Sequence, residues 1–260
     1  MLLTQSLIER LHHFQIDSMS RSIDFLRSVE PSTKGQVFGS GFATFAGDGS
    51  PLTKVYGIGH DGSNFDLEAI DLYFEGLSKN WELIVTPFSS RDLMQQATAR
   101  GYVPDHFETL MGQIVEPSAF EIPTGLTIEE VQDDLTEWTL VTDAGWMESE
   151  VLPQEPSHIG KVMAAWPARR YLGRIDGEPA ATACLCENNG TYLFAGACTR
   201  PQFRGRGLQT ALTRHRIQTA GAGALILVAA LPGSQSHRNL QRIGFQPIYS
   251  ELVMFRQATE

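Results

Sequence analysis

Apolar residues recur at intervals of three and four near the start of the chain. This spacing predicts an amphipathic helix within residues 3–28, with a stripe formed by Ile16, Met19, Ile23 and Leu26. Two stretches rich in apolar residues, VFGSGFATFAG and TKVYGIG, then flank a Gly-Asp-Gly-Ser-Pro turn. They predict a pair of strands joined at that turn.

Two further helix–strand pairs are predicted before residue 120. Asn64 is the expected N-cap of a helix whose apolar face carries Ile70 and Phe74, and the strand WELIVTPF follows that helix. Ser89 with Asp92 three residues later is typical of a helix start and predicts a helix over DLMQQATAR. HFETLMGQIV is expected as the last strand, and the prolines of EPSAFEIPTG mark a linker.

The second half predicts a similar order of elements. Residues 130–165 carry two helical stretches separated by GWMESEVLPQEPS, and three strands follow in YLGRIDG, PAATACLCE and TYLFAGACT. Asp-Gly and Asn-Asn-Gly sequences between these strands are typical of tight hairpin turns. A helix near residues 207–220, the strand ALILVAA, a helix near residues 234–243 and a closing strand complete the order.

One short sequence pattern occurs in both halves. GYVPDHFETLM (101–111) and GFQPIYSELVM (244–254) match at five offsets, and each follows a short helix and opens a strand. Together with the shared order of elements, this match favours an internal duplication. The chain length of 260 residues suits two domains, which we predict over residues 1–120 and 125–260.

Composition indicates a protein of the cytoplasm. The apolar run LILVAAL (225–231) has seven residues, and even with Ala224 before it the run is far shorter than the roughly 20 residues that a membrane helix needs. The N-terminus lacks a basic start and a cleavage signal, and three cysteines fit a reducing compartment. Cys184 and Cys186 are expected as buried small residues rather than as half of a metal site, so no metal is predicted.

The charges are unevenly distributed along the chain, whose net charge is −10. Residues 188–250 contain no Asp or Glu, and they carry seven arginines, namely Arg200, Arg204, Arg206, Arg214, Arg216, Arg238 and Arg242. This concentration favours an anionic ligand at one site, with a solvated arginine face as the alternative. RNA binding is disfavoured because the chain is acidic overall and lacks a basic surface interleaved with aromatic residues.

The sequence QFRGRG (202–207) lies between a predicted strand and a predicted helix. Glycines in such a turn let the backbone approach a phosphate, and a helix N-terminus adds N–H groups and partial positive charge. Arginines beside it can donate charge-assisted hydrogen bonds to phosphate oxygens. The turn is therefore a candidate phosphate-binding site.

With Pro201 before this turn and NLQRIGF after it, most of residues 125–257 resembles the GNAT acetyltransferases, in particular a tandem branch with a degenerate first half. The resemblance implies a mixed α/β fold of two tandem GNAT-like acyl-CoA N-acyltransferase domains. It also implies a splayed strand pair, acetyl-CoA as co-substrate, and one site per chain because HDGSNFDLE in the first half is acidic. The implied binding residues are Ala197, Cys198, Thr199, Gln202, Phe203, Arg204, Gly205, Arg206, Gly207, Leu208, Gln209, Ser234 and Asn239.

Catalytic groups are harder to assign. Many members of the family carry a tyrosine that protonates the leaving thiolate at the position of Leu240, which has no proton to donate. Ser234, Ser236 or His237 could take that role directly or through water, although serines at this place often only cap a helix. A carboxylate base must come from outside the acid-free interval, and Glu148 and Glu150 are the main candidates, followed by His158 and Glu251.

These features together predict an acetyltransferase that moves an acetyl group from acetyl-CoA to an amine of a small molecule or peptide. The amine would attack directly in a ternary complex, with Trp146 and Glu148 shaping the acceptor pocket. We expect a monomer or homodimer that binds neither nucleic acid nor membrane. The alternative is a catalytically lapsed acyl-CoA-binding regulatory or interaction module, which Leu240 and the missing base favour.

Overall fold

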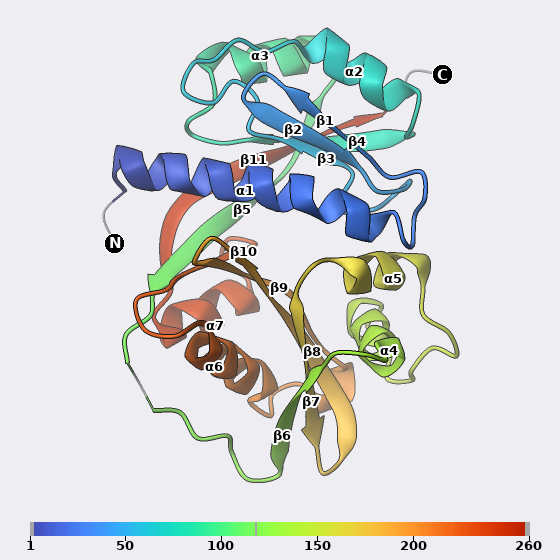
Figure 1. The fold of residues 1–260 in the computed structure, drawn as a ribbon, viewed down its shortest axis with the longest axis vertical. Coiled ribbons are helices and arrows are strands. Elements are labelled where there is room, and N and C mark those ends of the chain that lie inside the picture. Colours follow the sequence, from blue (N-terminus) through green and yellow to red (C-terminus); the bar gives the residue numbers. More distant parts are fainter. Residues whose placement is uncertain (1–2, 118, 258–260) are drawn as a thin grey trace. The chain divides into compact units, whose positions relative to one another are not determined.

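The computed structural model describes residues 3–117 and 119–257, and these residues form two compact units of mixed α/β structure (Figure 1). The first unit comprises residues up to Leu110 together with residues 230–234 and the segment from Pro247 onward. The second unit comprises Met111–Ala229 and Gln235–Gln246. The closing strand of the second sequence half therefore belongs to the first unit, whereas the sequence division at residues 120–125 assigned it to the second domain.

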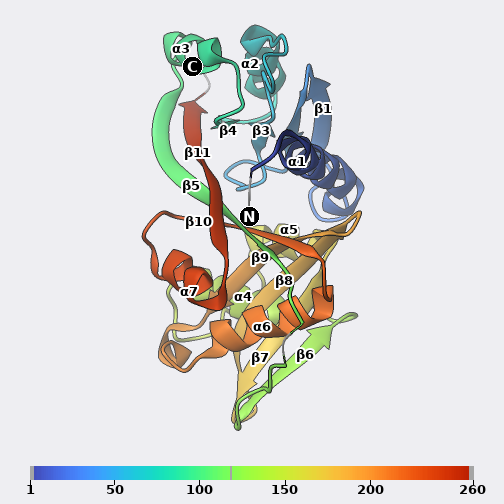
Figure 2. The same ribbon diagram turned by 90° about the vertical axis from the view of Figure 1, so that its left-hand side faces the viewer.

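The first unit packs helices on both faces of a sheet whose strand order is β1-β2-β3-β4-β11-β5. Strand β11 runs antiparallel to β4 over six residue pairs, from Leu252–Val85 to Gln257–Asn80 (Figure 2). The elements of this unit are α1 (Gln5–Leu26), β1 (Lys34–Phe38), β2 (Gly41–Phe45), β3 (Lys54–Tyr56), α2 (Leu67–Glu75), β4 (Asn80–Val85), α3 (Arg91–Ala99), β5 (Val103–Ile114) up to Leu110, and β11 (Gln246–Gln257) from Pro247.

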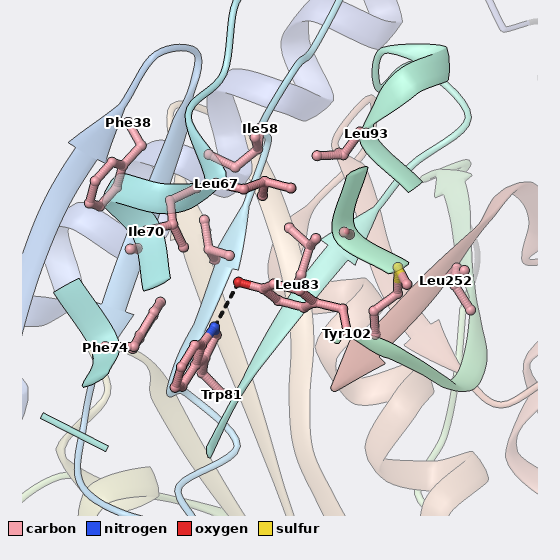
Figure 3. Packing of buried hydrophobic residues seen from close by; sticks show 14 of the residues in the cluster. Phe38, Ile58, Leu67, Ile70, Phe74, Trp81, Leu83, Leu93, Tyr102 and Leu252 are labelled. Atoms are coloured by element: carbon pink, nitrogen blue, oxygen red, sulfur yellow. Dashed lines mark hydrogen bonds between the residues drawn. The ribbon is translucent and has the colours of Figure 1, made fainter. Parts of the chain in front are cut away.

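Alternation along the strands divides the core of this unit between the two sheet faces. Val55 and Leu83 pack with α2 and α3, while their neighbours Tyr56 and Ile84 pack on the other face against Ile16 and Met19 of α1. Successive side chains of a strand point to opposite faces, so the same strands serve both layers. Within the larger layer the Trp81 indole donates a hydrogen bond of 2.9 Å to the Tyr102 hydroxyl (Figure 3).

Three local predictions in this unit were wrong. VFGSGFATFAG forms two strands rather than one, because Gly39 adopts φ +58° and closes a tight turn between Phe38 and Gly41. The N-cap of α2 is Asp66, whose side chain accepts from the Ala69 amide, and not Asn64.

Ser89 also does not start the following helix. Its hydroxyl contacts the amide of Thr86 at 3.2 Å, and α3 begins after Ser90 without a side-chain cap. Ser and Asn bond to nearby backbone in several loop conformations, so their sequence position alone does not fix a helix start.

The second unit follows the predicted order closely, with α4 and α5 on one face of the sheet and α6 and α7 on the other (Figure 1). Its strands lie in the order β10-β9-β8-β7-β6, and β6 was not predicted. The elements are β6 (Leu126–Val131), α4 (Thr136–Trp146), α5 (His158–Ala165), β7 (Arg169–Ile175), β8 (Glu178–Asn188), β9 (Thr191–Thr199), α6 (Leu208–Ala220), β10 (Leu225–Ala230) and α7 (Gln235–Ile243).

The two predicted hairpin turns of this unit are present. Asp176 and Gly177 join β7 to β8, and Asn189 and Gly190 join β8 to β9, all four with positive φ. Two successive positive φ values are characteristic of the type I′ turns that Asp-Gly and Asn-Gly sequences favour.

Among the described helices, none combines the length and apolar character needed to cross a membrane.

Strand β11 carries an ionisable group into the interior of the first unit. Glu251 is 5% exposed, and its Oε2 atom has no hydrogen-bond partner among the described residues. Burial, followed by the nearby charge of Glu108, raises the pKa of Glu251 to about 7, against the opposing effects of Lys54 and the Tyr56 hydroxyl. The folded chain thus favours the neutral form of this side chain.

Replacing this carboxyl group tests its effect on stability. Between pH 4.5 and about 7 the unfolded chain releases a proton that folded Glu251 retains, so this stabilisation is complete below pH 4.5 and is lost as the pH rises through 7. The free energy of unfolding should fall by about 3 kcal/mol over that range because of Glu251. Glu251→Gln should remove this contribution in urea titrations at several pH values, while the exposed-site control Glu121→Gln keeps it. Parallel pH profiles for wild type and Glu251→Gln would contradict this expectation.

Candidate functional site

A cavity of about 860 Å³ lies in the second unit where β9 and β10 part. The two strands run parallel and pair over three residues, the last pair being Leu193 and Leu227. Both strands continue beyond it, β9 to Thr199 and β10 to Ala230. Phe194 and Val228, the residues directly after the last pair, line the cavity. The cavity therefore begins at the vertex of a splayed strand pair, as the resemblance implied.

A bulge in β9 shapes one wall of this wedge. Pairing with β8 shifts between Thr182 and Cys184, so that Gly196 and Ala197 together oppose a single residue of β8. Gly196 has φ +56°, and a Cβ atom at that position would lie 3.0 Å from the Cys184 sulfur. A bulge bends its strand and redirects the side chains and backbone groups around it. Here it brings the backbone of β9 to the cavity at Ala197.

The turn after β9 leaves open space at both of its glycines. A short 3₁₀ helix, Pro201–Phe203, follows β9, and Gly205 and Gly207 then adopt φ values of +76° and +81°. A Cβ atom built on either glycine would meet no other atom within 4 Å. Gly207 is also the N-cap of α6, which has no side-chain cap. Glycine is therefore favoured at these two positions by the positive φ values, and not by close packing against neighbouring atoms. The space before the helix stays free of side chains.

The corresponding turn of the first unit, between β3 and α2, is filled at Gly57 and Gly59, although a Cβ atom on Gly62 would meet nothing within 4 Å. A Cβ atom on Gly57 would lie 2.7 Å from His12, and one on Gly59 would lie 3.1 Å from Phe65. The carboxylate of Asp66 caps the N-terminus of α2 and so places a negative charge where α6 has only a glycine. An anion is therefore disfavoured beside the start of α2, since the Asp66 carboxylate would repel it and already accepts from the Ala69 amide.

Arg204, at the start of the glycine turn, is held by the α4–α5 loop. Its guanidinium forms a two-pronged ion pair with the carboxylate of Glu148, including a bond of 2.9 Å from Nη2 to Oε1. Arg204 also donates to the carbonyls of Thr199 at 3.1 Å and Gly145 at 3.2 Å. The hydrogen bond from Arg204 lowers the pKa of Glu148 below its usual value. Glu148 is consequently a weaker base than an isolated glutamate.

Three other polar side chains fix the end of β9. Arg200 and Gln202 both donate to the Glu150 carbonyl at 2.7 Å, which ties the turn to the α4–α5 loop. Gln209 on α6 donates to the Cys198 carbonyl at 2.6 Å and to the Thr199 hydroxyl at 3.0 Å. Since these bonds reach three separate segments, they hold the strand end, the turn and the loop in one arrangement.

The cavity brings together most of the side chains that the sequence proposed. Its lining includes Glu148, Ala197, Cys198, Thr199, Phe203, Arg204, Gly205, Gly207, Leu208, Gln209, Ser236 and Asn239. The lining does not include Glu150, Gln202, Arg206, Ser234 or His237. Arg206 instead pairs with Asp176 at 3.4 Å on the surface, and Ser234 is part of the first unit.

Several lining residues were not proposed from the sequence, and Arg216 is the most unusual of them. The sequence did carry a signal for it, because Leu208, Leu212 and Arg216 follow one another at intervals of four on the buried face of α6. Such a stripe places an arginine among apolar neighbours. The remaining additions are Gly145, Trp146, Phe194, Thr210, Thr213, Val228, Gln235, Leu240 and Ile243, of which Trp146 was considered for the acceptor pocket and Leu240 for the proton donor.

All three cysteines are buried and reduced, as expected for Cys184 and Cys186. Burial raises the pKa of the Cys184 thiol to about 12 and raises that of Cys198, which also contacts the Thr182 hydroxyl at 3.1 Å. Cys198 lines the cavity, but it is protonated at neutral pH. Its role there is packing against α4, because Thr142 and Val141 carbonyls lie within 3.7 Å of its sulfur.

The approach of α4 to β9 gives a test of this packing. A Cβ atom on Gly145 would lie 2.6 Å from the Cys198 sulfur and 2.8 Å from its Cβ. Gly145→Ala should lower the free energy of unfolding by about 1–3 kcal/mol, since neither contact can be relieved by a flexible side-chain end. Gly76→Ala is the control, because a Cβ atom there meets nothing within 4 Å. Equal urea midpoints for the two variants would show that α4 does not pack this closely.

Comparison with known proteins gives matches at the level of structure. No family model matches the sequence. No curated protein matches it either. A GCN5-related N-acetyltransferase from Kribbella flavida superposes with a TM-score of 0.58 at 18% identity, covering 94% of this chain and 96% of the other. A tandem GNAT protein from the clavulanic acid biosynthesis pathway gives 0.57 at 12% identity with the same coverage.

A GCN5-related N-acetyltransferase from Sphaerobacter thermophilus matches 70% of this chain with a TM-score of 0.52 and 17% identity. This chain spans 60% of the length of that protein. The two broader matches extend over both units, and one of them is itself a tandem protein. The predicted fold is thus confirmed: the chain has the mixed α/β fold of the GCN5-related N-acetyltransferases, in its tandem form.

Proposed function

We propose that this chain is an N-acetyltransferase of the GNAT superfamily, which transfers an acetyl group from acetyl-CoA to an amine of a small molecule or peptide. One observation carries the proposal. The open glycine turn and the uncapped start of α6 face the same cavity as the wedge between β9 and β10. An extended anionic ligand needs both features, a phosphate cradle and a slot for its arm.

The donor would lie along β9 and the glycine turn. Backbone amides from Phe203 to Leu208 would hold the pyrophosphate, with the partial positive charge at the start of α6 adding to the attraction. The bulge at Gly196 turns the backbone of Ala197 to Thr199 toward the cavity, and this backbone would bind the pantetheine arm. The space free of side chains at Gly205 and Gly207 suits the close approach of phosphate oxygens.

In the reaction the acceptor amine attacks the thioester carbonyl carbon directly. A C–N bond forms as the C–S bond breaks, the amine loses one proton, and the CoA sulfur leaves and takes up one proton. Backbone amides of β9 that face the cavity would stabilise the negative charge that develops on the carbonyl oxygen. Positioning of the two reactants supplies much of the rate enhancement.

Trp146, the last residue of α4, and Glu148 in the α4–α5 loop border the cavity and would shape the acceptor pocket. Glu148 would attract a cationic amine and orient Arg204, but its lowered pKa and its ion pair make it a poor proton acceptor. Ser236 lines the cavity from α7 and remains the candidate donor to the leaving sulfur. Glu150 and His237 are less suitable, since neither is among the cavity-lining residues.

One donor site per chain follows from the difference between the two turns. In the first unit, His12 and Phe65 occupy the space beside Gly57 and Gly59, and Asp66 caps the helix. The first unit would therefore act as a structural partner rather than a second enzyme. We further propose that the two-domain division near residues 120–125 describes the duplicated sequence, whereas in the folded chain the closing strand of the second half joins the first unit.

The donor site is tested by introducing a negative charge into the glycine turn. Gly205→Glu and Gly207→Glu should abolish binding of acetyl-CoA in calorimetric titrations, because each places a carboxylate against the expected pyrophosphate. Gly223→Glu is the matched control, since Gly223 has φ +81°, equally open space and no place in the cavity lining. All three variants should show the same loss of stability from the strained backbone, about 1–2 kcal/mol. Unchanged affinity in both turn variants would refute this donor site.

The pH dependence of turnover tests the absence of a strong base at the site. Among the described cavity-lining side chains, Glu148 has its pKa lowered and Cys198 has its pKa raised, and burial lowers the pKa of Arg216 only to about 10, so none is shifted to near neutrality. The value of kcat/KM should therefore rise tenfold per pH unit until the acceptor amine itself is deprotonated. Glu148→Gln should leave that slope unchanged in an assay of free thiol release. A bell-shaped profile centred near pH 7 that disappears in Glu148→Gln would overturn this mechanism.

The same assay separates the enzyme from a binding module. Thiol release with any member of an amine panel supports the transferase. Tight binding of acetyl-CoA without release on the whole panel would instead favour a module whose chemistry has lapsed.

A further inference from the structure

Arg216 lies on the third turn of α6, at the floor of the wedge between β9 and β10. It is only 2% exposed, yet it lines the cavity. Its Nη1 atom donates to the Cys184 carbonyl at 2.8 Å, and its Nε atom donates to the Leu212 carbonyl at 3.2 Å. The ring of Phe194 lies 4.0 Å from the guanidinium carbon. These contacts hold the side chain in a fixed orientation.

The charge of Arg216 is not neutralised by a neighbouring acid. No carboxylate of the described residues forms an ion pair with it, and the ionisable groups around it are the Cys184 and Cys186 thiols and the Tyr171 phenol. Burial lowers the pKa of Arg216 to about 10, so the guanidinium is still charged at neutral pH. A buried charge is costly unless an opposite charge or several hydrogen bonds compensate it.

One donor of this guanidinium is left for a ligand. Nη2 has no hydrogen-bond partner among the described residues, while Nε and Nη1 are both engaged. Arg216 follows Gly207 by nine residues, which is roughly 13 Å along a helix. It lies with Phe194 and Val228 at the vertex of the strand pair, the end of the cavity opposite the glycine turn.

These positions determine which part of a donor would meet Arg216. With the phosphates held at the glycine turn, the arm along β9 would carry the thioester inward, toward the vertex. Phe194 and Val228 offer an apolar lining for methylene groups there, and Arg216 offers a cation beyond them. A donor whose acyl group ends in a methyl group would leave the cation without a counter-charge.

We propose that this cavity prefers acyl-CoA donors whose acyl group ends in a carboxylate, and that Arg216 binds that carboxylate through Nη2. The inference rests on the proposed donor site and on N-acyl transfer, and it replaces acetyl with a carboxylated acyl group as the preferred group transferred. The transfer balances as before: the acceptor gains a succinyl or malonyl group by a C–N bond, the C–S bond breaks, and one proton passes from the amine to the CoA sulfur. The terminal carboxylate stays ionised throughout.

The direct test compares donors that differ in this one group. Succinyl-CoA and butyryl-CoA both carry four acyl carbons, and malonyl-CoA and propionyl-CoA both carry three. Calorimetric titration of the wild-type chain should give roughly 10- to 100-fold tighter binding of at least one carboxylated donor than of its uncharged counterpart. Equal or tighter binding of both uncharged donors would overturn the inference.

Variants then locate the effect. Arg216→Met should remove the preference by weakening the carboxylated donor and leaving the uncharged donor within about threefold. Arg214→Met is the matched control, since Arg214 is an exposed arginine on the same helix that lies over Phe120 outside the cavity lining. Equal weakening of both donors by Arg216→Met would assign the residue a structural role only and refute the proposal.

Two further measurements keep the outcomes distinct. If Arg216→Met does not fold, as judged by its thermal transition, the wild-type comparison of paired donors decides the question alone. Free CoA is titrated first in every case. Failure of CoA and of all four thioesters to bind would refute the donor site itself, whereas binding of CoA without donor preference would refute only this inference.

Discussion

The divergence of β9 from β10 is the constraint on which the second unit depends. Three parallel pairs hold the strands together, and beyond Leu193 and Leu227 each strand must find other partners for its backbone. The bulge at Gly196 bends β9 away, and the cavity occupies the wedge that results. A sheet opened in this way would be a poorly satisfied edge unless the strand end were held by other groups.

Side chains from three directions provide that hold. Gln209 on α6 bonds the last residues of β9, Arg204 joins the same strand end to α4 and Glu148, and Arg200 and Gln202 reach the Glu150 carbonyl. The seven arginines of the acid-free interval thus have different functions. Arg204 and Arg206 pair with acids from outside the interval, and Arg200 and Arg216 are buried. The concentration of arginines in this interval therefore has a partly structural explanation, because Arg200 and Arg204 donate hydrogen bonds to backbone carbonyls around the end of β9.

Much of this arrangement could be predicted from the sequence, because it depends on local signals. Strand alternation, Asp-Gly and Asn-Gly turns and the glycine turn before α6 are each determined by neighbouring residues. Helix caps were less predictable, since Asn64 and Asp66 are equally good N-caps by type and only the fold chooses between them. Strand β6 was missed because its side chains are all partly exposed, without a clear apolar face.

The tertiary contacts of the site could not be predicted from local sequence patterns. The sequence suggested Gln202 and Arg204 as ligands, and the structure gives them backbone and carboxylate partners that lie about fifty residues away in the chain. Likewise, the pattern of β11 is the same whichever sheet it joins, so its place in the first unit could not be read from its residues. Long-range pairing is determined by the whole fold, and no window of the sequence contains it.

The place of β11 also has a consequence for how the protein is made. A ribosome releases residues 3–110 early, but the sheet of that unit lacks its β11 partner for β4 until residues 247–257 have emerged. The part that is synthesised first is thus completed last, and in the meantime β4 presents an open edge to other nascent chains. For the same reason, cutting the gene between the two sequence halves would give one fragment without its sheet partner and another with a surplus strand.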